Sequence, residues 1–164
     1  MTTWNEFLTD APRVAGVFNR RHRATGHLCL LGTLRADGSP RISPIEPRVF
    51  EGLLVLAGMP KTRKFADLAR DPRFCLHTAT ADPMVGDGDA KLFGTVTDLK
   101  DKDLHTRFLQ HLFEESGFDA RGEEFDHFFV ADRLTGGSTV ELVEGRLEIT
   151  VWTPGKGERV EVKN

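Results

Sequence analysis

The sequence predicts a mainly β fold, a small antiparallel barrel with short helices between its strands. Roughly seven or eight short apolar segments have the character of strands. Tight turns join several of them, of which Ala36–Ser39 and Glu144–Gly145 are the clearest, and such turns connect antiparallel neighbours. Two or three segments have the helical spacing of apolar residues instead. Closing a sheet of this kind into a barrel protects edges that otherwise promote aggregation.

The length of 164 residues predicts one domain over 1–164, long enough to bury a core without disulfides or metals. Within it we expect an N-terminal helical segment (1–26), a barrel core (27–99), a helical excursion (100–126) and C-terminal strands (127–164).

The composition excludes several classes of protein. A net charge of −3 argues against a nucleic-acid binder, which usually has a basic surplus. The apolar segments are far shorter than the roughly 20 residues of a membrane-spanning helix, and the N-terminus does not resemble a secretory signal. Cys29 and Cys75 lie in apolar segments, as expected for buried thiols in a reducing compartment. We therefore expect a cytoplasmic protein with no membrane or nucleic-acid partner.

The N-terminal segment predicts a helix that begins at Thr3. Thr3 and Glu6 have the spacing of a capping box, in which each side chain satisfies a free backbone donor. Pro12 is expected to break or kink this helix because proline lacks a backbone N–H.

Strands are expected in most of the remaining chain. Pro44 and Pro47 lie inside one of them and each removes a ladder donor, which indicates an edge strand or a bulge. The expected strands are His27–Leu34, Pro40–Phe50, Leu53–Gly58, Arg73–Ala79, Ala90–Leu99, Phe128–Asp132, Thr139–Val143 and Arg146–Trp152, with one more possible in the tail after Pro154.

Two further helices are expected between these strands. The first follows Thr62, ends at Asp71 and has Phe65, Leu68 and Ala69 as its apolar face. The second covers Asp101–Glu115.

A basic segment stands out where the strand Leu53–Gly58 gives way to the first of these helices. Lys61, Thr62, Arg63 and Lys64 bring three cations and a hydroxyl to a helix N-terminus, where free N–H groups favour an anion. Cations there oppose the helix dipole, so a compensating anion is a reasonable inference. Arg41 and Ser43, on the neighbouring hairpin, extend the candidate phosphate site.

Other chemistry is missing from the sequence. It contains no nucleophile elbow, zinc-protease motif, Cys-x-x-Cys pair or phosphate loop. The acidic loop 82–89 lacks the spaced ligands of a calcium site, and no pair of histidines has the spacing of metal ligands on one helix face. No metal is expected, and no catalytic residue can be named.

Several segments, in order, resemble the split-barrel superfamily of pyridoxamine 5′-phosphate oxidase-like flavin and deazaflavin oxidoreductases. They are Gly32–Pro44 (GTLRADGSPRISP), Leu53–Gly58, Lys61–Lys64 (KTRK) and Asp67–Phe74 (DLARDPRF), together about half of the chain. The resemblance implies a split barrel that binds FMN, or alternatively the deazaflavin coenzyme F420, between the two subunits of a homodimer.

The resemblance also implies roles for particular residues. Arg41 would face the cofactor phosphate, and Thr62, Arg63 and Lys64 would grip it. The backbone of Ala57 and Gly58 would contact the ring or the ribityl chain. Trp152 and Arg159 resemble a C-terminal pair that the partner subunit supplies, although Trp152 also suits a core position.

Three interpretations of the function stay open. The first is an oxidoreductase that transfers hydride between the cofactor and a small organic substrate; the cofactor would supply the chemistry. The chain has no tyrosine, whereas the true oxidases use one near the ring, so a broader reductase or deazaflavin branch fits better. The second is a carrier that binds flavin or haem without turnover, with His77 as a candidate haem ligand. A small barrel that binds a protein partner is a third, plainer interpretation.

Overall fold

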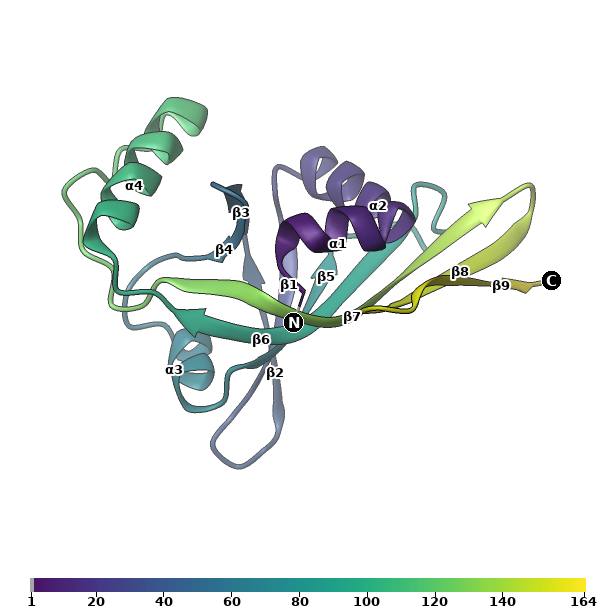
Figure 1. Cartoon of the computed structure of the whole chain (residues 1–164), viewed down its shortest axis with the longest axis horizontal. Helices are drawn as coiled ribbons and strands as arrows, with labels where there is room; N and C mark the ends of the chain where they lie inside the picture. The colour runs from purple at the N-terminus through teal and green to yellow at the C-terminus, as the bar shows by residue number, and fades with distance from the viewer. Residues whose placement is uncertain (1) are drawn as a thin grey trace.

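The computed structural model describes residues 2–164. In this part of the chain nine strands form one antiparallel sheet, and four helices pack against it (Figure 1). The strands are β1 Cys29–Leu34, β2 Pro40–Ile45, β3 Arg48–Phe50, β4 Leu53–Leu56, β5 Arg73–Thr78, β6 Asp89–Asp98, β7 Phe129–Val143, β8 Arg146–Thr153 and β9 Gly157–Lys163. The helices are α1 Trp4–Asp10, α2 Pro12–Ala24, α3 Arg63–Arg70 and α4 Lys102–Ser116.

The sheet is an open, split barrel, which confirms the predicted fold class. Its strand order is β2-β1-β5-β6-β7-β4-β3, and β8 and β9 extend it from β7. The first residues of β7 pair with β4, whereas its last seven pair with β8. β2 and β3 are consecutive in the chain but end the sheet on opposite sides, so the sheet does not close between them.

The expected strand Pro40–Phe50 is therefore two strands. Pro44 and Pro47 lack the N–H that a ladder requires. Pro44 lies in β2, an edge strand as predicted, and Pro47 lies in the break before β3. At this break the chain leaves one end of the sheet and enters the other.

The two expected strands Phe128–Asp132 and Thr139–Val143 are one continuous strand, β7. The glycines between them permit close strand packing rather than a turn. A Cβ atom on Gly137 would lie 2.9 Å from the carbonyl oxygen of Lys91. On the facing strand, a Cβ on Gly94 would lie 2.1 Å from that of Arg133, at the bulge where β6 shifts register against β7.

The N-terminal prediction is confirmed. Thr3 caps α1 with its side chain, and Glu6 completes the capping box. The helix ends before Ala11, and Pro12 begins α2 at a position where its missing N–H costs nothing. No helix in residues 2–164 is long and apolar enough to cross a membrane.

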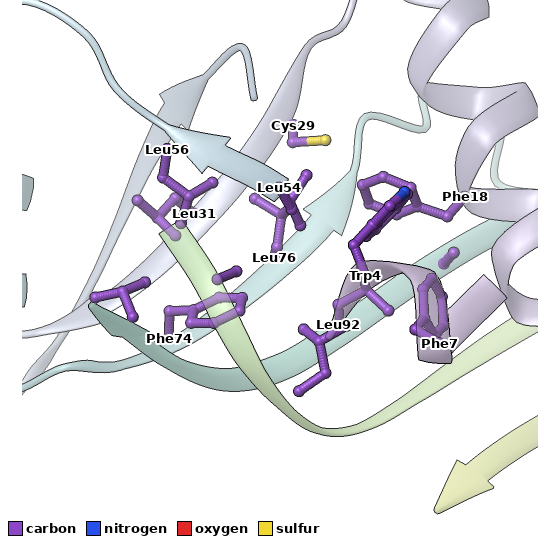
Figure 2. Close-up of a cluster of buried hydrophobic side chains, with 14 of the residues drawn as sticks. Trp4, Phe7, Phe18, Cys29, Leu31, Leu54, Leu56, Phe74, Leu76 and Leu92 are labelled. Atoms are coloured by element: carbon purple, nitrogen blue, oxygen red, sulfur yellow. The ribbon is translucent and has the colours of Figure 1, made fainter. Parts of the chain in front are cut away.

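Side chains from α1, α2, α3 and the inner face of the sheet form the main core. Figure 2 shows this core, in which Trp4, Phe7 and Phe18 of the N-terminal helices belong to one cluster with Leu31, Leu76 and Leu92 of the strands. A smaller cluster lies under α4, where Leu104 and Phe108 pack on Val55 and Val130. The α3 helix enters the main core through Phe65 and Leu68, so packing fixes the helix that carries the basic segment.

Candidate cofactor site

The basic segment lies where the chain leaves β4 and enters α3, as predicted. Thr62 is the residue that precedes α3, and its hydroxyl oxygen is buried without a hydrogen-bond partner in the described chain. No acidic residue lies in the first turn of α3, whose first N–H groups have no partner within the helix. The backbone N–H of Lys61 donates to Asp126 Oδ2 (2.9 Å), which holds the loop in place. Unsatisfied donors therefore converge at this helix end.

Beside this helix end, four arginines line a shallow cavity of 390 Å³, which we call the arginine pocket. One wall is α3, and the other is the turn between β1 and β2. Its lining residues are Arg35, Ala36, Asp37, Arg41, Arg63, Ala66, Asp67 and Arg70. Four cations against two carboxylates leave the pocket with a net positive charge, which suits an anionic ligand.

Asp67 is the buried residue that holds two arginines of the pocket in place. The residue is 3% exposed, and it accepts hydrogen bonds from Arg41 Nε (2.6 Å), Thr33 Oγ1 (2.8 Å) and Arg70 Nη2 (3.1 Å). Burial by itself raises the pKa of Asp67, but these three donors outweigh it and hold the pKa below its ordinary value. The carboxylate thus fixes Arg41 and Arg70 in orientation.

Arg35 and Arg63 are the free cations of the pocket. Neither side chain makes an ion pair or a hydrogen bond within residues 2–164, and both are exposed. Lys64 does not line the pocket, and its ammonium lies 5.5 Å from the centre of the ring of Phe65, in the first turn of α3. The site thus combines two cations held by Asp67 with two that are available to a ligand.

A family model described as pyridoxamine 5′-phosphate oxidase matches residues 20–133, which include every strand and helix that forms this site. The chain belongs to the pyridoxamine 5′-phosphate oxidase family. The resemblance seen in the sequence is thereby confirmed. No curated protein matches the chain by sequence.

Solved structures of three kinds share the fold. A pyridoxamine 5′-phosphate oxidase-related, FMN-binding protein from Nostoc punctiforme has a TM-score of 0.64 at 14% identity, over 93% of this chain and 95% of that one. An F420 reductase has a TM-score of 0.52 at 18% identity, over 68% and 88%. HutZ, the haem storage protein of Vibrio cholerae, has a TM-score of 0.58 at 13% identity, over 77% and 91%. At these identities the likeness establishes the fold.

The structure brings together only part of the site that the family resemblance implied. Arg41 and Arg63 share the arginine pocket, and Thr62 and Lys64 lie at the same helix end. Ser43 lies two residues beyond Arg41 on the same side of β2 and is half-buried. The other residues of the predicted site lie in the loop after β4 or near the C-terminus.

The loop residues Ala57 and Gly58 differ in their surroundings. Ala57 packs against the cluster under α4. Gly58 is exposed, and a Cβ atom there would lie 3.5 Å from the Phe65 ring. The backbone at Gly58 is therefore open to a ligand beside α3.

Trp152 lies in the main core. Its side chain is 1% exposed, packs on Phe7 with 5.1 Å between ring centres, and donates from Nε1 to Asp10 Oδ2 (2.7 Å). A contact with a cofactor from this position requires unpacking of the core, so these contacts favour the core position that the sequence left open for Trp152. Arg159 is exposed on β9 and pairs with Glu161 (2.9 Å). β9 extends from the opposite end of the sheet to α3 (Figure 1), so a role for Arg159 at the site requires a second subunit.

The sequence interpretation missed Asp67, Arg35 and Arg70. Ala69 was assigned to the apolar face of α3 but is exposed, whereas Asp67 is buried. The helical spacing of Arg63, Asp67 and Arg70 contained the signal, because residues four and seven positions apart share one helix face.

His22 and Cys29 have structural surroundings. His22 is buried and its Nε2 lies 2.8 Å from the carbonyl oxygen of Pro47. Burial lowers the pKa of His22 below its usual value, and nearby His27 and Arg48 lower it further, against the opposing effect of that hydrogen bond. Burial raises the pKa of the Cys29 thiol to about 12. Among residues 2–164, no three His, Cys, Asp or Glu side chains gather as a metal site.

Proposed function

We propose that this chain is an oxidoreductase that binds FMN, or alternatively the deazaflavin coenzyme, at the N-terminus of α3. The observation that carries the proposal is the set of unsatisfied donors there: the orphaned hydroxyl of Thr62, the free N–H groups of the first turn and the unpaired guanidinium of Arg63. A phosphate monoester, with nearly two negative charges and three acceptor oxygens, matches this donor set.

Each residue has a distinct part in binding. Arg63 is suited to a bidentate grip on the phosphate, and Thr62 supplies a hydroxyl that has no hydrogen-bond partner within residues 2–164. Lys64 contributes charge from the second helical position. Gly58 leaves room beside Phe65 for the part of the cofactor next to the phosphate. A bound flavin or deazaflavin supplies the hydride chemistry, so the protein needs chiefly to bind and orient it.

We further propose a homodimer that forms through the outer face of the sheet. Ile42, Gly32, Cys75 and Phe93 follow one another across β2, β1, β5 and β6. Ile42 is 74% exposed, and Leu30 and Phe93 are about half as exposed as Ile42. A row of uncovered apolar side chains on a regular sheet is typical of an interaction surface. In an isologous dimer the same row meets itself, and Arg159 of one subunit is then free to approach the site of the other.

The cofactor proposal is tested by a matched pair of ligands. Binding of FMN and of riboflavin, which lacks the phosphate, is measured by flavin fluorescence. We expect FMN to bind at micromolar concentration or tighter and riboflavin at least tenfold more weakly. The double substitution Arg63→Gln, Lys64→Gln should remove this difference, whereas Arg146→Gln, an exposed arginine at the β7–β8 turn, should not. Equal affinities for FMN and riboflavin contradict a phosphate site. The deazaflavin coenzyme is tested in parallel.

The dimer is tested by its mass in solution. Ile42→Glu places a charge on the most exposed side chain of the apolar row, at its β2 end, and should shift the molar mass measured by light scattering from dimer towards monomer. Met84→Glu is the matched control, because Met84 is similarly exposed at 65% but lies in the loop before β6. A monomeric wild-type chain refutes the proposal.

Cofactor carriage without turnover is the second candidate function. His77 favours it, since its side chain is about one-third exposed on the outer face, with Nδ1 2.5 Å from the carbonyl oxygen of Thr78 and Nε2 3.9 Å from Asp89. Absorbance spectra distinguish the two functions. A Soret band that disappears in His77→Ala supports a haem carrier, whereas bound flavin that is reduced and then reoxidised by organic acceptors supports the oxidoreductase.

A further inference from the structure

A separate cavity lies between α2, β3 and α4, which are in the upper half of the view in Figure 1, whereas α3 is in the lower half. Its volume is about 180 Å³, and we call it the histidine pocket. Its lining includes His22, Arg23, His27, Arg48, Val49 and Glu115.

The strand β1 separates this pocket from the candidate cofactor site. His27 comes just before β1, whereas Thr33, near the far end of the strand, donates to Asp67 of α3. β1 has six residues, and a strand of that length spans about 17–20 Å. The histidine pocket is therefore distinct from the arginine pocket and from the first turn of α3.

Arg48, on β3, is the buried cation of the histidine pocket. Its side chain is 11% exposed, and its Nε and Nη1 atoms are buried without a hydrogen-bond partner in residues 2–164. Its one ion pair among these residues is with Glu115, whose Oε2 lies 3.8 Å from Nε, which is too far for a hydrogen bond. Buried polar groups normally have partners, because an unmade bond leaves their lost hydration uncompensated. Arg48 therefore lacks an acceptor.

Glu115 neutralises the pocket only in part. Its carboxylate lies at similar distances from three groups, because it is also 3.6 Å from His27 Nε2 and 3.2 Å from His111 Nε2. It is the one carboxylate among the residues that line the pocket, whereas Arg23 adds a second guanidinium at the exposed rim. The lining thus has a net positive charge, which favours an anion.

The two histidines respond to the same charge. Burial lowers the pKa of both His22 and His27, and the positive charge of Arg48 lowers it further. Both rings are therefore mainly neutral at pH 7.5, and a neutral imidazole keeps one N–H. Nε2 of His22 faces the carbonyl oxygen of Pro47 at 2.8 Å. The ring of His27 has no such partner within residues 2–164, so its N–H is available to a ligand.

The backbone at His27 is also unusual. Its φ is 70°, a left-handed conformation that costs free energy in a residue with a Cβ atom and that is concentrated at binding sites. The residue that offers a free N–H to the pocket is thus held in a strained conformation.

We propose that the histidine pocket binds a small oxyanion, with the guanidinium of Arg48 as its main partner and His27 and Arg23 as further donors. Its oxygen atoms accept charge-assisted hydrogen bonds from the guanidinium. The cavity is smaller than the roughly 300–1,000 Å³ of pockets that hold drug-sized ligands, so the ligand is a small ion and not a second flavin. The inference goes beyond the proposed function and does not depend on it.

Two sources of the oxyanion have the same chemistry at Arg48. One is inorganic phosphate or sulfate, and the other is the carboxylate of a small organic acid. Val49 is a partly exposed apolar residue of the lining, and it offers a contact to the carbon chain of an organic acid. Direct comparison of the two kinds of anion identifies the source.

The experiment follows the imidazole signals of His27 by NMR, assigned with His27→Gln. The full chain is titrated at pH 7.5 and one fixed ionic strength with phosphate, sulfate, acetate and malonate in turn. We expect at least one anion to shift these signals saturably, with a dissociation constant in the millimolar range or tighter. The readout is local, so an anion bound at the start of α3 does not produce it.

Four variants decide whether the shift reports the proposed site. Arg48→Gln should weaken binding at least about tenfold, whereas Glu115→Gln, which removes the competing carboxylate, should strengthen it. Arg146→Gln removes a charge at a distant turn and should leave the affinity unchanged. The shift should persist in Arg63→Gln, Lys64→Gln, so this proposal and the proposed function fail independently.

No saturable shift with any of the four anions overturns the proposal. A shift that Arg48→Gln leaves unchanged overturns it as well, and so does a shift that is lost in Arg63→Gln, Lys64→Gln. If Arg48→Gln does not fold, Glu115→Gln decides, because Glu115 is partly exposed and its replacement should preserve the fold. An affinity that does not rise in Glu115→Gln then contradicts the site.

Discussion

Replacing Asp67 with asparagine should destabilise the fold markedly, although it changes few atoms. The carboxylate is 3% exposed and accepts from Arg41, Thr33 and Arg70. Removing one partner of a buried ion pair costs about 3–5 kcal/mol. Solvent offsets part of this loss, because the side chains of Arg41 and Arg70 remain 20% and 43% exposed. We therefore expect the free energy of unfolding of Asp67→Asn to fall by about 3 kcal/mol at pH 7.

Urea denaturation measures this change, and a double-mutant cycle apportions it. Combining Asp67→Asn with Arg41→Gln should reveal a coupling energy of about 2 kcal/mol. Asp37→Asn is the control, since Asp37 lines the same pocket but only caps the exposed turn at Ser39. A loss below about 1 kcal/mol, or no coupling with Arg41, refutes the organising role of Asp67.

The pH dependence of this difference follows from the lowered pKa of Asp67. A carboxyl group with a depressed folded-state pKa contributes stability that is fully present above its ordinary pKa, near 3.9. That stability is lost as the pH falls through the folded-state pKa, because the proton then weakens the bonds from both arginines. The gap between wild type and Asp67→Asn should therefore be constant from neutral pH to about pH 5 and close at lower pH.

Three further predictions concern the packing of the fold. Gly94→Ala should cost at least ~3 kcal/mol of unfolding free energy, because the new Cβ would lie 2.1 Å from a backbone oxygen. The control Gly32→Ala, whose Cβ would lie 3.5 Å from its nearest neighbour, should fold almost normally. Similar stabilities of the two variants in urea would contradict the close approach at Gly94. Trp152→Phe should lower stability by about 2 kcal/mol through its lost hydrogen bond and leave FMN affinity unchanged, and a loss of affinity would restore Trp152 to the cofactor site. The lowered pKa of His22 means that the folded state resists its protonation, so wild type should lose stability as the pH falls below about 6.5 towards the folded-state pKa. Between pH 7.5 and pH 5.5, urea titrations should show that His22→Gln loses about 1 kcal/mol less unfolding free energy than wild type. Equal losses in the two proteins would assign the effect to other groups.

Much of the fold could be predicted because the signals are local. The capping box at Thr3, the break at Pro12 and the turn at Gly38 each act within a few residues, and the structure confirms all three. The continuity of β7 could not be predicted, because its glycines resemble a turn in sequence. Only the facing carbonyl of Lys91, 46 positions before Gly137, shows that they allow close strand packing.

In the candidate site, too, the local features could be predicted from the sequence and the tertiary ones could not. The segment Lys61–Lys64 has a local signal, cations at a helix start, and the structure places it there. The arginine pocket depends on tertiary contacts between Arg35 in a turn and Asp67 on a helix, which no local pattern specifies. Trp152 fits a family pattern for a cofactor residue, but its contacts with Asp10 and Phe7, which hold it in the core, could not be predicted from that pattern.

The most direct test of the cofactor site is a crystal structure of the chain with FMN. We predict a dimer in which the phosphorus atom lies at the first turn of α3, with its oxygens in hydrogen-bond contact with Thr62 and Arg63. A phosphate bound elsewhere, such as on the outer face near His77, or a flavin bound with its phosphate in solvent, would contradict it.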